Sequence, residues 1–276
     1  MKLAVLSGKG GTGKTTVSAS LAAVVPSCQY IDCDVEEPNG AIFLKPELKE
    51  KSPVKVLVPE IDMTKCNFCG LCAKACQFNA IAVVKDKVLV FLEICHHCGA
   101  CKIACPNDAI LEVERTIGVV EANEDGTFLQ GKLDVGEPIS IPIINELKKH
   151  IKEDRFVILD CPPGASCAVV NSIEGCDYCV LIAEPTPFGL HDIKIAVQLV
   201  KNMGIPFGVV LNKASNDNRS IHHFCQSEGI EILMEIPFSK EIAEGYSKGI
   251  LPVEINDLWN EKFKKLYEKI EGGAHK

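Results

Sequence analysis

A glycine-rich stretch near the start of the chain has the residue types and spacing of a phosphate-binding loop. Residues 8–15 match the pattern G-x-x-x-x-G-K-T without a gap. The glycines allow the backbone to turn several N–H groups toward one anion, and a helix that begins there adds its positive dipole end. Lys14 is therefore predicted to bind the β- and γ-phosphates of a nucleotide, and Thr15 to hold Mg²⁺. The predicted contacts to the nucleotide in this loop are Gly8, Lys9, Gly10, Gly11, Thr12, Gly13, Lys14, Thr15 and Thr16.

Two runs of cysteine have a spacing that binds iron–sulfur clusters. Each run reads C-x₂-C-x₂-C-x₃-C, and every cysteine of the first run recurs 29 residues later in the second. In two-cluster ferredoxins, three thiolates of a run bind one cluster and the fourth binds the other. The first predicted [4Fe-4S] site consists of Cys66, Cys69, Cys72 and Cys105. The second predicted [4Fe-4S] site consists of Cys95, Cys98, Cys101 and Cys76.

Zinc held by paired C-x₂-C motifs is the alternative for these runs. Zinc ribbons do not need a third and a fourth cysteine at these spacings, twice over, so the sequence favours clusters. A proline follows the last cysteine of the second run but not of the first, which leaves every predicted ligand in place. His96 and His97 lie between ligands and are expected to be solvated or to support the ligands rather than to bind metal.

Short apolar strands and amphipathic helices alternate along the rest of the chain and would position the loop. Met1–Ser7 is an apolar run before the loop, and a helix is predicted from Thr15 to Val25, before Pro26. Further strands are predicted at 29–32, 156–160, 178–183, 207–211 and 232–236, with a hairpin of residues 116–120 and 127–133. Further helices are predicted at 139–151, 190–202, 219–228, 241–248 and 256–270. The alternation predicts an α/β fold with a doubly wound, mainly parallel sheet.

The composition excludes several classes of protein. The chain has 276 residues, of which 47% are hydrophobic, so it can bury a core and is not disordered. Its formal net charge of −8 makes it a poor non-specific binder of nucleic acid. No apolar run approaches the ~18 residues of a membrane span, and the apolar start is too short for a secretory signal. Fifteen cysteines without a signal point to metal or redox use, so we expect a cytoplasmic protein.

Acidic residues end two of the predicted strands, where α/β sheets place their ligands. Asp160 ends a buried apolar run and fits the Walker-B role, in which an acid reaches Mg²⁺ through water. Asp32 and Asp34 stand at the end of the strand that follows the predicted first helix. A solvated turn is the plain alternative in both places, but the neighbouring phosphate loop favours a role in nucleotide binding.

The sequence around these acids and the loop resembles the MinD, Mrp, ParA and nitrogenase iron-protein superfamily of P-loop ATPases. Lys9 is a second lysine within the loop, and residues 160–164 are similar to the D-x-P-P-G second switch of Mrp and MinD proteins. The resemblance implies that Lys9 reaches across a nucleotide-bound dimer to the partner's phosphates. It also implies that Asp34 positions or activates the attacking water. The residues to which it assigns catalysis are Lys9, Lys14, Asp34 and Asp160.

The same resemblance implies supporting residues and a division into domains. Asp32 and Asn39 would support the first switch, and Asn212 and Pro237 would contact the nucleobase. The resemblance covers nearly the whole chain, in which residues 1–59 and 114–276 would form a P-loop ATPase domain. A small α+β domain similar to bacterial ferredoxin is inserted at residues 60–113. We expect ATP or ADP, Mg²⁺ and two [4Fe-4S] clusters to be bound.

The sequence leaves three functions of such an ATPase open. ATP would close a homodimer, or a heterodimer with a paralogue, and hydrolysis would release it. The dimer could transfer electrons to a redox partner, assemble or insert clusters in an accepting partner, or position a cargo. Two closed sites of four thiolates favour stable electron carriers. No basic stretch supports positioning, and the helix predicted at 256–270 is expected to pack on its own domain rather than on a membrane.

The other seven cysteines have no assigned role. They are Cys28, Cys33, Cys161, Cys167, Cys176, Cys179 and Cys225. Free cysteine is commonly a small buried apolar residue, and we expect this of most of them. Cys176 and Cys179 have the spacing of a metal motif, but Cys179 enters a predicted buried strand, which favours packing.

Overall fold

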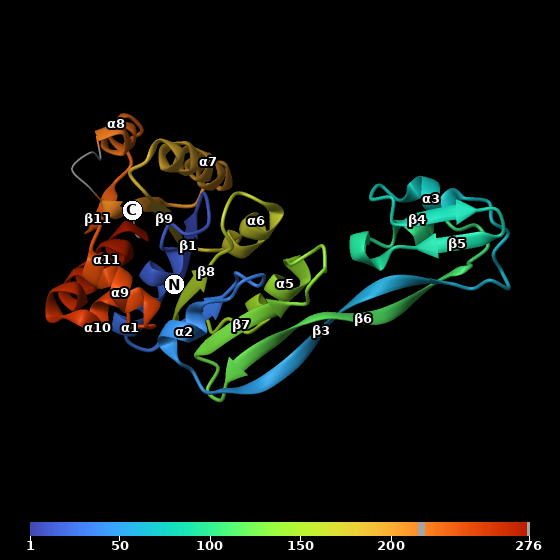
Figure 1. Ribbon diagram of the computed structural model, residues 1–276, viewed down its shortest axis with the longest axis horizontal. Helices are drawn as coiled ribbons and strands as arrows, with labels where there is room; N and C mark the ends of the chain where they lie inside the picture. The colour runs from blue at the N-terminus through green and yellow to red at the C-terminus, as the bar shows by residue number, and fades with distance from the viewer. Residues whose placement is uncertain (215–218, 275–276) are drawn as a thin grey trace.

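The computed structural model describes residues 1–214 and 219–274 and has two parts joined by a long two-stranded ribbon (Figure 1). The ribbon consists of β3 (Leu48–Ile61) and β6 (Ile110–Asn123). Residues 62–109, which we call the insert, lie at the far end of the ribbon. The remaining described residues form the larger part, which we call the body.

The body contains a nine-stranded sheet that is parallel except at one edge. Its order is β11-β10-β9-β1-β8-β2-β7-β6-β3 within the described chain. The strands other than the ribbon are β1 (Lys2–Ser7), β2 (Cys28–Asp32), β7 (Phe128–Leu133), β8 (Phe156–Asp160), β9 (Tyr178–Ala183), β10 (Phe207–Ala214) and β11 (Ile232–Pro237). Among the described strand pairs of this sheet, only β7·β6 and β6·β3 are antiparallel. The predicted doubly wound, mainly parallel sheet is therefore confirmed, and the carboxyl ends of its parallel strands share one edge.

Helices cover both faces of the sheet and enclose two apolar cores. One face carries α1 (Lys14–Val24), α2 (Gly40–Leu44), α9 (Lys240–Ser247), α10 (Pro252–Ile255) and α11 (Asp257–Ala274). The other face carries α5 (Ile141–Lys149), α6 (Cys167–Ile173), α7 (Pro187–Met203) and α8 (Arg219–Ser227). Burial of these apolar helix faces holds the three layers together, because each buried aliphatic or aromatic side chain contributes about 1.5–3 kcal/mol.

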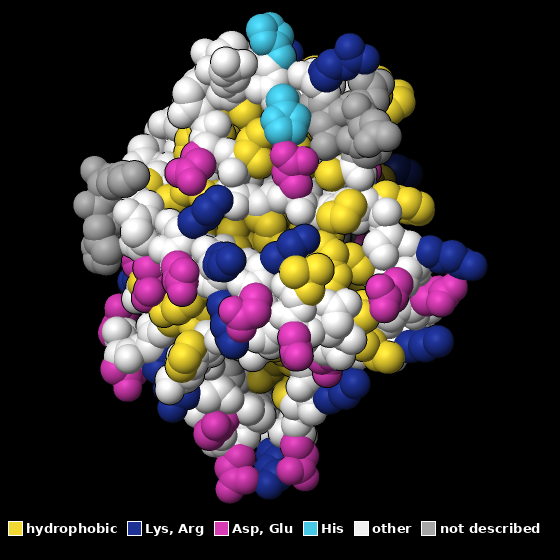
Figure 2. Space-filling view, turned by 90° about the vertical axis from the view of Figure 1, so that its left-hand side faces the viewer, with side chains coloured by type: hydrophobic (Ala, Val, Ile, Leu, Met, Phe, Trp, Pro, Cys, Tyr) yellow, Lys and Arg dark blue, Asp and Glu magenta, His cyan; other side chains and the backbone are white. Residues whose placement is uncertain are grey.

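Helix α11 packs on the body, as its apolar stripe predicts. Trp259, Phe263, Leu266 and Ile270 are buried in the core that α1 also lines. Figure 2 shows the end of the body opposite the insert, where lysine and acidic side chains are interspersed with separate apolar areas. No helix in the described part of the chain is long and apolar enough to cross a membrane.

The ribbon is longer than the sequence predicts. It pairs Leu48 with Asn123 at the body end and Ile61 with Ile110 at the insert end. Strand β3 escapes prediction because Pro53 and Pro59 interrupt its hydrogen-bonding pattern. Proline is tolerated there because β3 is an edge strand with one neighbour. Both strands run across the positions at which the sequence places the domain boundaries.

The insert contains two similar halves. Its elements are α3 (Leu71–Ala75), β4 (Ile81–Val84), β5 (Lys87–Val90), the 3₁₀ turn η1 (Leu92–Ile94) and α4 (Ala100–Ile103). The two short helices each follow a left-handed glycine, with φ of 74° at Gly70 and 71° at Gly99. The side chains that the insert buries are Ala80, Ile81, Cys95 and Ala109. A unit of this size with so small a core needs a further source of stability.

Candidate functional site

The phosphate loop connects β1 to α1 and is held in shape by β10. Gly13 precedes α1 with φ of 91°, a left-handed conformation that glycine adopts without strain. A Cβ atom at this position would lie 2.1 Å from Nδ2 of Asn212. That same Nδ2 donates a hydrogen bond to the Thr12 carbonyl at 2.7 Å. Gly13 is therefore required both by its backbone angle and by the approach of Asn212.

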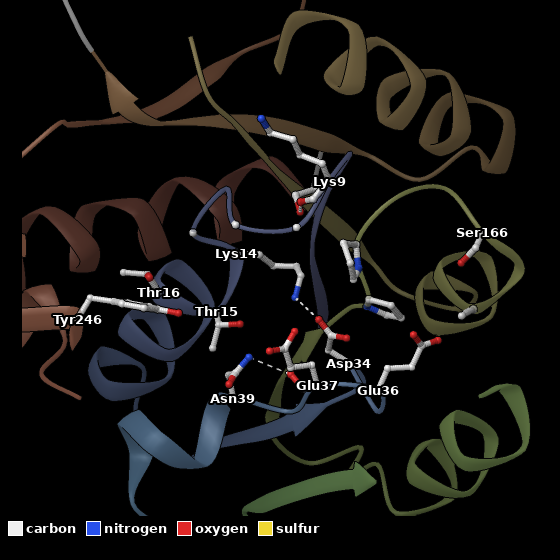
Figure 3. A pocket seen from close by; sticks show the side chains of 17 residues that line it. Lys9, Lys14, Thr15, Thr16, Asp34, Glu36, Glu37, Asn39, Ser166 and Tyr246 are labelled. Carbon is white, nitrogen blue, oxygen red and sulfur yellow. Dashed lines mark hydrogen bonds and ion pairs between the residues drawn. The ribbon is translucent and has the colours of Figure 1, made fainter. Parts of the chain in front are cut away.

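Lys14 points from the loop into a group of carboxylates. Its Nζ lies 3.1 Å from Asp160 Oδ1 and 3.3 Å from Asp34 Oδ2 (Figure 3 shows the contact with Asp34). Asp160 is fully buried at the end of β8, and its other oxygen accepts a 2.8 Å hydrogen bond from the Tyr30 hydroxyl. Asp32, at the end of β2, accepts the N–H groups of Asp34 and Gly40, which fixes the turn after that strand.

This group of charges is unbalanced in a way that suits a divalent cation. Burial lowers the pKa of Lys14, but Asp160, Asp34 and Asp32 outweigh burial and hold that pKa above its ordinary value. Burial raises the pKa of Asp32, as does the charge of Asp160. Burial also raises the pKa of Asp34, against the effect of Lys14. Asp34 and Asp160 both pair with the one ammonium of Lys14, so negative charge is left for Mg²⁺ to neutralise, and Thr15 lines the same cavity as Asp34.

Two neighbouring cavities extend from the loop. One, of about 260 Å³, is lined by the loop, by Asp34 and Asn39 from the predicted first switch, and by Glu36 and Glu37. The other, of about 280 Å³, is lined by Asn212 and Pro237, as the predicted nucleobase site requires, and by more apolar side chains. Together they have the polarity expected of a phosphate site next to a base site.

Tyr246 is a residue of this site that the sequence does not reveal. It belongs to α9 and lines both cavities. Its ring also lies against Phe43 of α2, with 5.0 Å between the ring centroids. No motif surrounds it, so only the packing of α9 beside the loop brings it to the site.

Lys9 lies apart from the acids that hold Lys14. Its side chain points to the other side of the loop (Figure 3), where its Nζ lies 3.3 Å from Glu184 Oε2. Glu184 follows β9, and its other oxygen pairs with Lys213. Burial raises the pKa of Glu184, but the two lysines outweigh burial and hold it below its ordinary value. Glu184 is not identified from the sequence, although an acid at the end of a predicted strand is the same pattern that identifies Asp160.

The eight cysteines of the two runs gather in two separate pockets of the insert. One pocket is lined by Cys66, Cys69, Cys72 and Cys105. The other is lined by Cys76, Cys95, Cys98 and Cys101. The fourth cysteine of each run thus joins the first three of the other run, which is the exchange that the spacing predicts.

Each pocket has four cysteine side chains in its lining. No three His, Cys, Asp or Glu side chains of residues 1–214 and 219–274 converge closely enough to hold one metal ion. A [4Fe-4S] cube binds each thiolate at a separate iron, so it needs sulfurs spread around a cavity. Two backbone N–H groups already point at sulfur, from Ala80 to Cys76 Sγ and from Ala109 to Cys105 Sγ, both at 3.3 Å.

Of the seven other cysteines, all in the body, Cys33, Cys161, Cys179 and Cys225 are buried as apolar residues are. Cys161 and Cys179 are fully buried in the core beneath α6 and α7, and burial raises the pKa of both thiols. Cys225 is buried under α8. Cys167 is exposed at the start of α6.

A short series of contacts connects the phosphate site to the ribbon. The Val35 carbonyl, next to Asp34, accepts the Leu133 N–H at 2.9 Å at the end of β7. The chain then continues to Glu137, whose carboxylate pairs with Arg115 of β6. Glu137 is almost fully buried, so this ion pair is better shielded than the others on the ribbon.

Comparison with known proteins gives a consistent picture. The CbiA family model, the CobQ/CobB/MinD/ParA nucleotide-binding domain, matches residues 3–253. An uncharacterised protein of Methanocaldococcus jannaschii is 33% identical over 98% of this chain and 96% of its own length. An iron-sulfur cluster carrier protein of Pyrococcus horikoshii is 24% identical over 98% of this chain and 85% of its own. The septum site-determining protein MinD of Pyrococcus horikoshii, solved with Mg-ADP, has a similar fold, with a TM-score of 0.59, 19% identity, and coverage of 98% and 96%.

Proposed function

Because the chain belongs to the CobQ/CobB/MinD/ParA nucleotide-binding family, we propose that it couples its nucleotide state to electron transfer with a partner protein. The chain is a P-loop ATPase, and two [4Fe-4S] clusters in its insert would carry the electrons. The observation that carries this proposal is the gathering of eight cysteines into two pockets of four, at the end of a ribbon that belongs to the ATPase sheet. Eight closely placed thiolates serve stable redox groups well.

The residues of the body would bind and cleave Mg-ATP without a covalent intermediate. The loop N–H groups and Lys14 would hold the β- and γ-phosphates, which requires Lys14 to leave Asp34 and Asp160. Mg²⁺ would supply positive charge to the phosphate oxygens, with Thr15 and Asp160 as its protein partners. Asp34, once released by Lys14, would orient the attacking water.

A second copy of the chain would complete the site. Lys9 is engaged by Glu184 within its own chain, so it does not stabilise charge on its own nucleotide. In an ATP-bound dimer, Lys9 would leave Glu184 and reach the phosphates of the partner, where it would stabilise the transition state. Hydrolysis would then weaken the dimer and return Lys9 to Glu184.

Coupling to the insert would use the contacts between Asp34 and the ribbon. A shift of the first switch on γ-phosphate binding would move Val35, and with it the end of β7. The Glu137–Arg115 pair would carry that shift to β6, which enters the insert. Any such coupling is reciprocal, so reduction of the clusters would change the affinity for ATP.

Anaerobic purification tests the proposal directly. The expected result is about eight irons and eight sulfides per chain, the count of two cubes, with electron paramagnetic resonance of reduced [4Fe-4S] clusters. Redox titrations without nucleotide, with ADP and with a non-hydrolysable ATP analogue should then differ, and the Asp160→Asn variant should reduce the difference. Stoichiometric zinc without a cluster signal would refute the clusters. Identical titrations in all nucleotide states would refute the coupling.

Cluster delivery to an acceptor protein is a second candidate with a specific observation behind it. Cys69 and Cys98, one in each pocket, are exposed. The similar protein of Pyrococcus horikoshii is named an iron-sulfur cluster carrier protein. A carrier should lose iron to a chelator and transfer clusters to an apo-ferredoxin in minutes, faster with ATP. Retention of iron under both conditions would leave electron transfer as the function.

A further inference from the structure

The two cysteine pockets differ at one matched position of the repeat. Between its first two cysteines, the first run carries Asn67 and Phe68, and the second run carries His96 and His97. Phe68 and His97 have the same left-handed backbone conformation, with φ of 60° and 53°. The repeat therefore presents a phenyl ring to one pocket and an imidazole to the other on the same backbone.

The imidazole of His97 is buried at its polar atoms without a partner. Both ring nitrogens are shielded from solvent, and neither has a hydrogen-bond partner among the described residues. An imidazole carries at least one N–H in either protonation state. A buried N–H without an acceptor is unfavourable, so such a group needs an explanation. The thiols of Cys76, Cys95, Cys98 and Cys101 line the same pocket, so sulfur is one acceptor within this cavity.

The polar groups around the two pockets differ as well. Glu112 lines the second pocket, and Lys102 pairs with it at 2.6 Å. The side chains that line the first pocket are uncharged apart from its cysteines. An N–H donor to sulfur favours the more negative, reduced state of a nearby cluster.

We propose that His97 donates a hydrogen bond to a sulfur of the second cluster, and that the first electron to enter the protein therefore comes to rest on this cluster. The inference rests on the proposed presence of two clusters. His97 would raise the reduction potential of the second cluster through this hydrogen bond, without binding iron. The one electron comes from an external low-potential donor; when it passes from the first cluster to the second, the first is oxidised and the second is reduced.

The two clusters would lie at different distances from the body along the ribbon, which gives electron transfer between them a direction. The second pocket is lined by Leu57 and Pro59, which lie nearer the body along β3. The first is lined by Ile61 and Ile110, the pair at the far end of the ribbon. The electron would thus come to rest on the cluster closer to the ATPase body and to the Arg115–Glu137 pair. The far cluster would be the entry point for electrons.

Exchange of the two matched side chains tests the inference. Anaerobic full-length protein, reduced stepwise with dithionite and followed by electron paramagnetic resonance, should show two reduction steps. His97→Phe should lower the potential of the upper step, and Phe68→His should raise that of the lower step. His97→Asn, which keeps an N–H donor and suits a left-handed backbone, should retain most of the wild-type value. A tenfold change in the reduction equilibrium of a one-electron step corresponds to about 59 mV, which the titration detects.

The outcomes separate this inference from the proposed function. Protein without iron would refute the clusters themselves. Full iron with an unchanged upper step in His97→Phe, or a shift of the same step in both exchanged variants, would overturn the role of His97. If His97→Phe loses iron, the other two variants still test the role of His97. A higher potential of the lower step in Phe68→His, together with a wild-type potential of the upper step in His97→Asn, would support that role. Any other result would contradict it.

Discussion

The body and the insert achieve order in different ways. The body buries two large apolar cores, and its phosphate site is assembled from the ends of five different strands without any ligand. The insert buries four side chains, one of them a cysteine, and its two halves repeat a short local pattern. The body therefore has a preformed site with an excess of negative charge, whereas we propose that the insert gains much of its stability from the clusters that its cysteines would bind.

The largest expected effect concerns the two loop lysines, which the body holds in different places. Lys14→Ala should abolish nucleotide binding, because we propose that Lys14 holds the phosphates within its own chain. Lys9→Ala should leave binding within a few-fold but lower turnover by ~10³-fold or more, the range of a charge supplied by a partner. Equilibrium binding of a fluorescent ATP analogue and steady-state phosphate release measure the two effects.

The exposed pair of Lys201, on α7, with Glu228, just after α8, offers a control outside the nucleotide site. Lys201→Ala should change neither binding nor turnover. Hydrolysis at the parent rate in Lys9→Ala would show that the body completes its site alone, and the dimer mechanism would then be wrong.

The next largest effect concerns the small apolar core of the insert. Removal of one thiolate from each pocket, by Cys72→Ala with Cys101→Ala, should leave residues 62–109 largely unfolded, because their core cannot replace the lost clusters. Amide hydrogen exchange should show loss of protection across the insert and unchanged protection in β1, β8 and β9. Cys225→Ala, in the body, is the matched control and should keep full iron.

A protected insert in the iron-free double variant would contradict the contrast between the two parts. It would mean that the ribbon and the few buried side chains suffice to order this unit. Iron analysis on the same samples shows whether clusters are absent when the exchange is measured.

A smaller effect is expected at the junction between body and insert. ATP binding should shift the cluster potentials by ~1–3 kcal/mol of coupling, where 1.4 kcal/mol corresponds to about 59 mV. Glu137→Gln should reduce this shift, because it breaks the buried pair with Arg115. Redox titrations with ADP and with a non-hydrolysable ATP analogue measure it. Glu114→Gln, which breaks an exposed pair with Lys55 on the same ribbon, is the control. Equal shifts in both variants would exclude the Glu137 route.

The smallest effect concerns the unbalanced charges beneath the loop. Burial raises the pKa values of Asp32 and Asp34 above the ordinary carboxyl range near 4, so the native state binds more protons than the unfolded chain above that pH. The free energy of unfolding of the nucleotide-free protein should therefore fall as pH rises from about 4 toward the Asp32 pKa of about 8, by at least ~1 kcal/mol. Lys14 stays protonated there and does not change the sign.

Melting temperatures over a pH series measure this slope. Mg²⁺ with ADP should stabilise the protein more at higher pH, since the cation no longer competes with protons. Asp32→Asn should flatten the slope, and the exposed Glu228→Gln should not. If the free energy of unfolding of the nucleotide-free protein rises with pH instead, burial does not raise the pKa values of these acids in the native state.

Much of both regions could be predicted because the decisive patterns are local. The phosphate loop depends on glycines and a lysine within eight residues, and the cysteine runs depend on spacings of two and three. Apolar strand runs ending in Asp32 or Asp160 identify the edge of the sheet where ligands bind. The apolar stripe of α11 likewise predicts its packing on the body. Local spacing determines these features because neighbouring residues in the chain make them.

Only the tertiary structure decided which residues meet across the sheet. The order β9-β1-β8-β2 places Glu184 beside Lys9 and Asp160 beside Lys14, and β10 brings Asn212 against Thr12 from 200 residues away. The ribbon pairs a proline-bearing edge strand that local propensity disfavours. The orphaned nitrogens of His97 are also visible only once the insert is folded. Strand order and packing fix these contacts, and both depend on the burial of the whole chain rather than on spacing within any one segment.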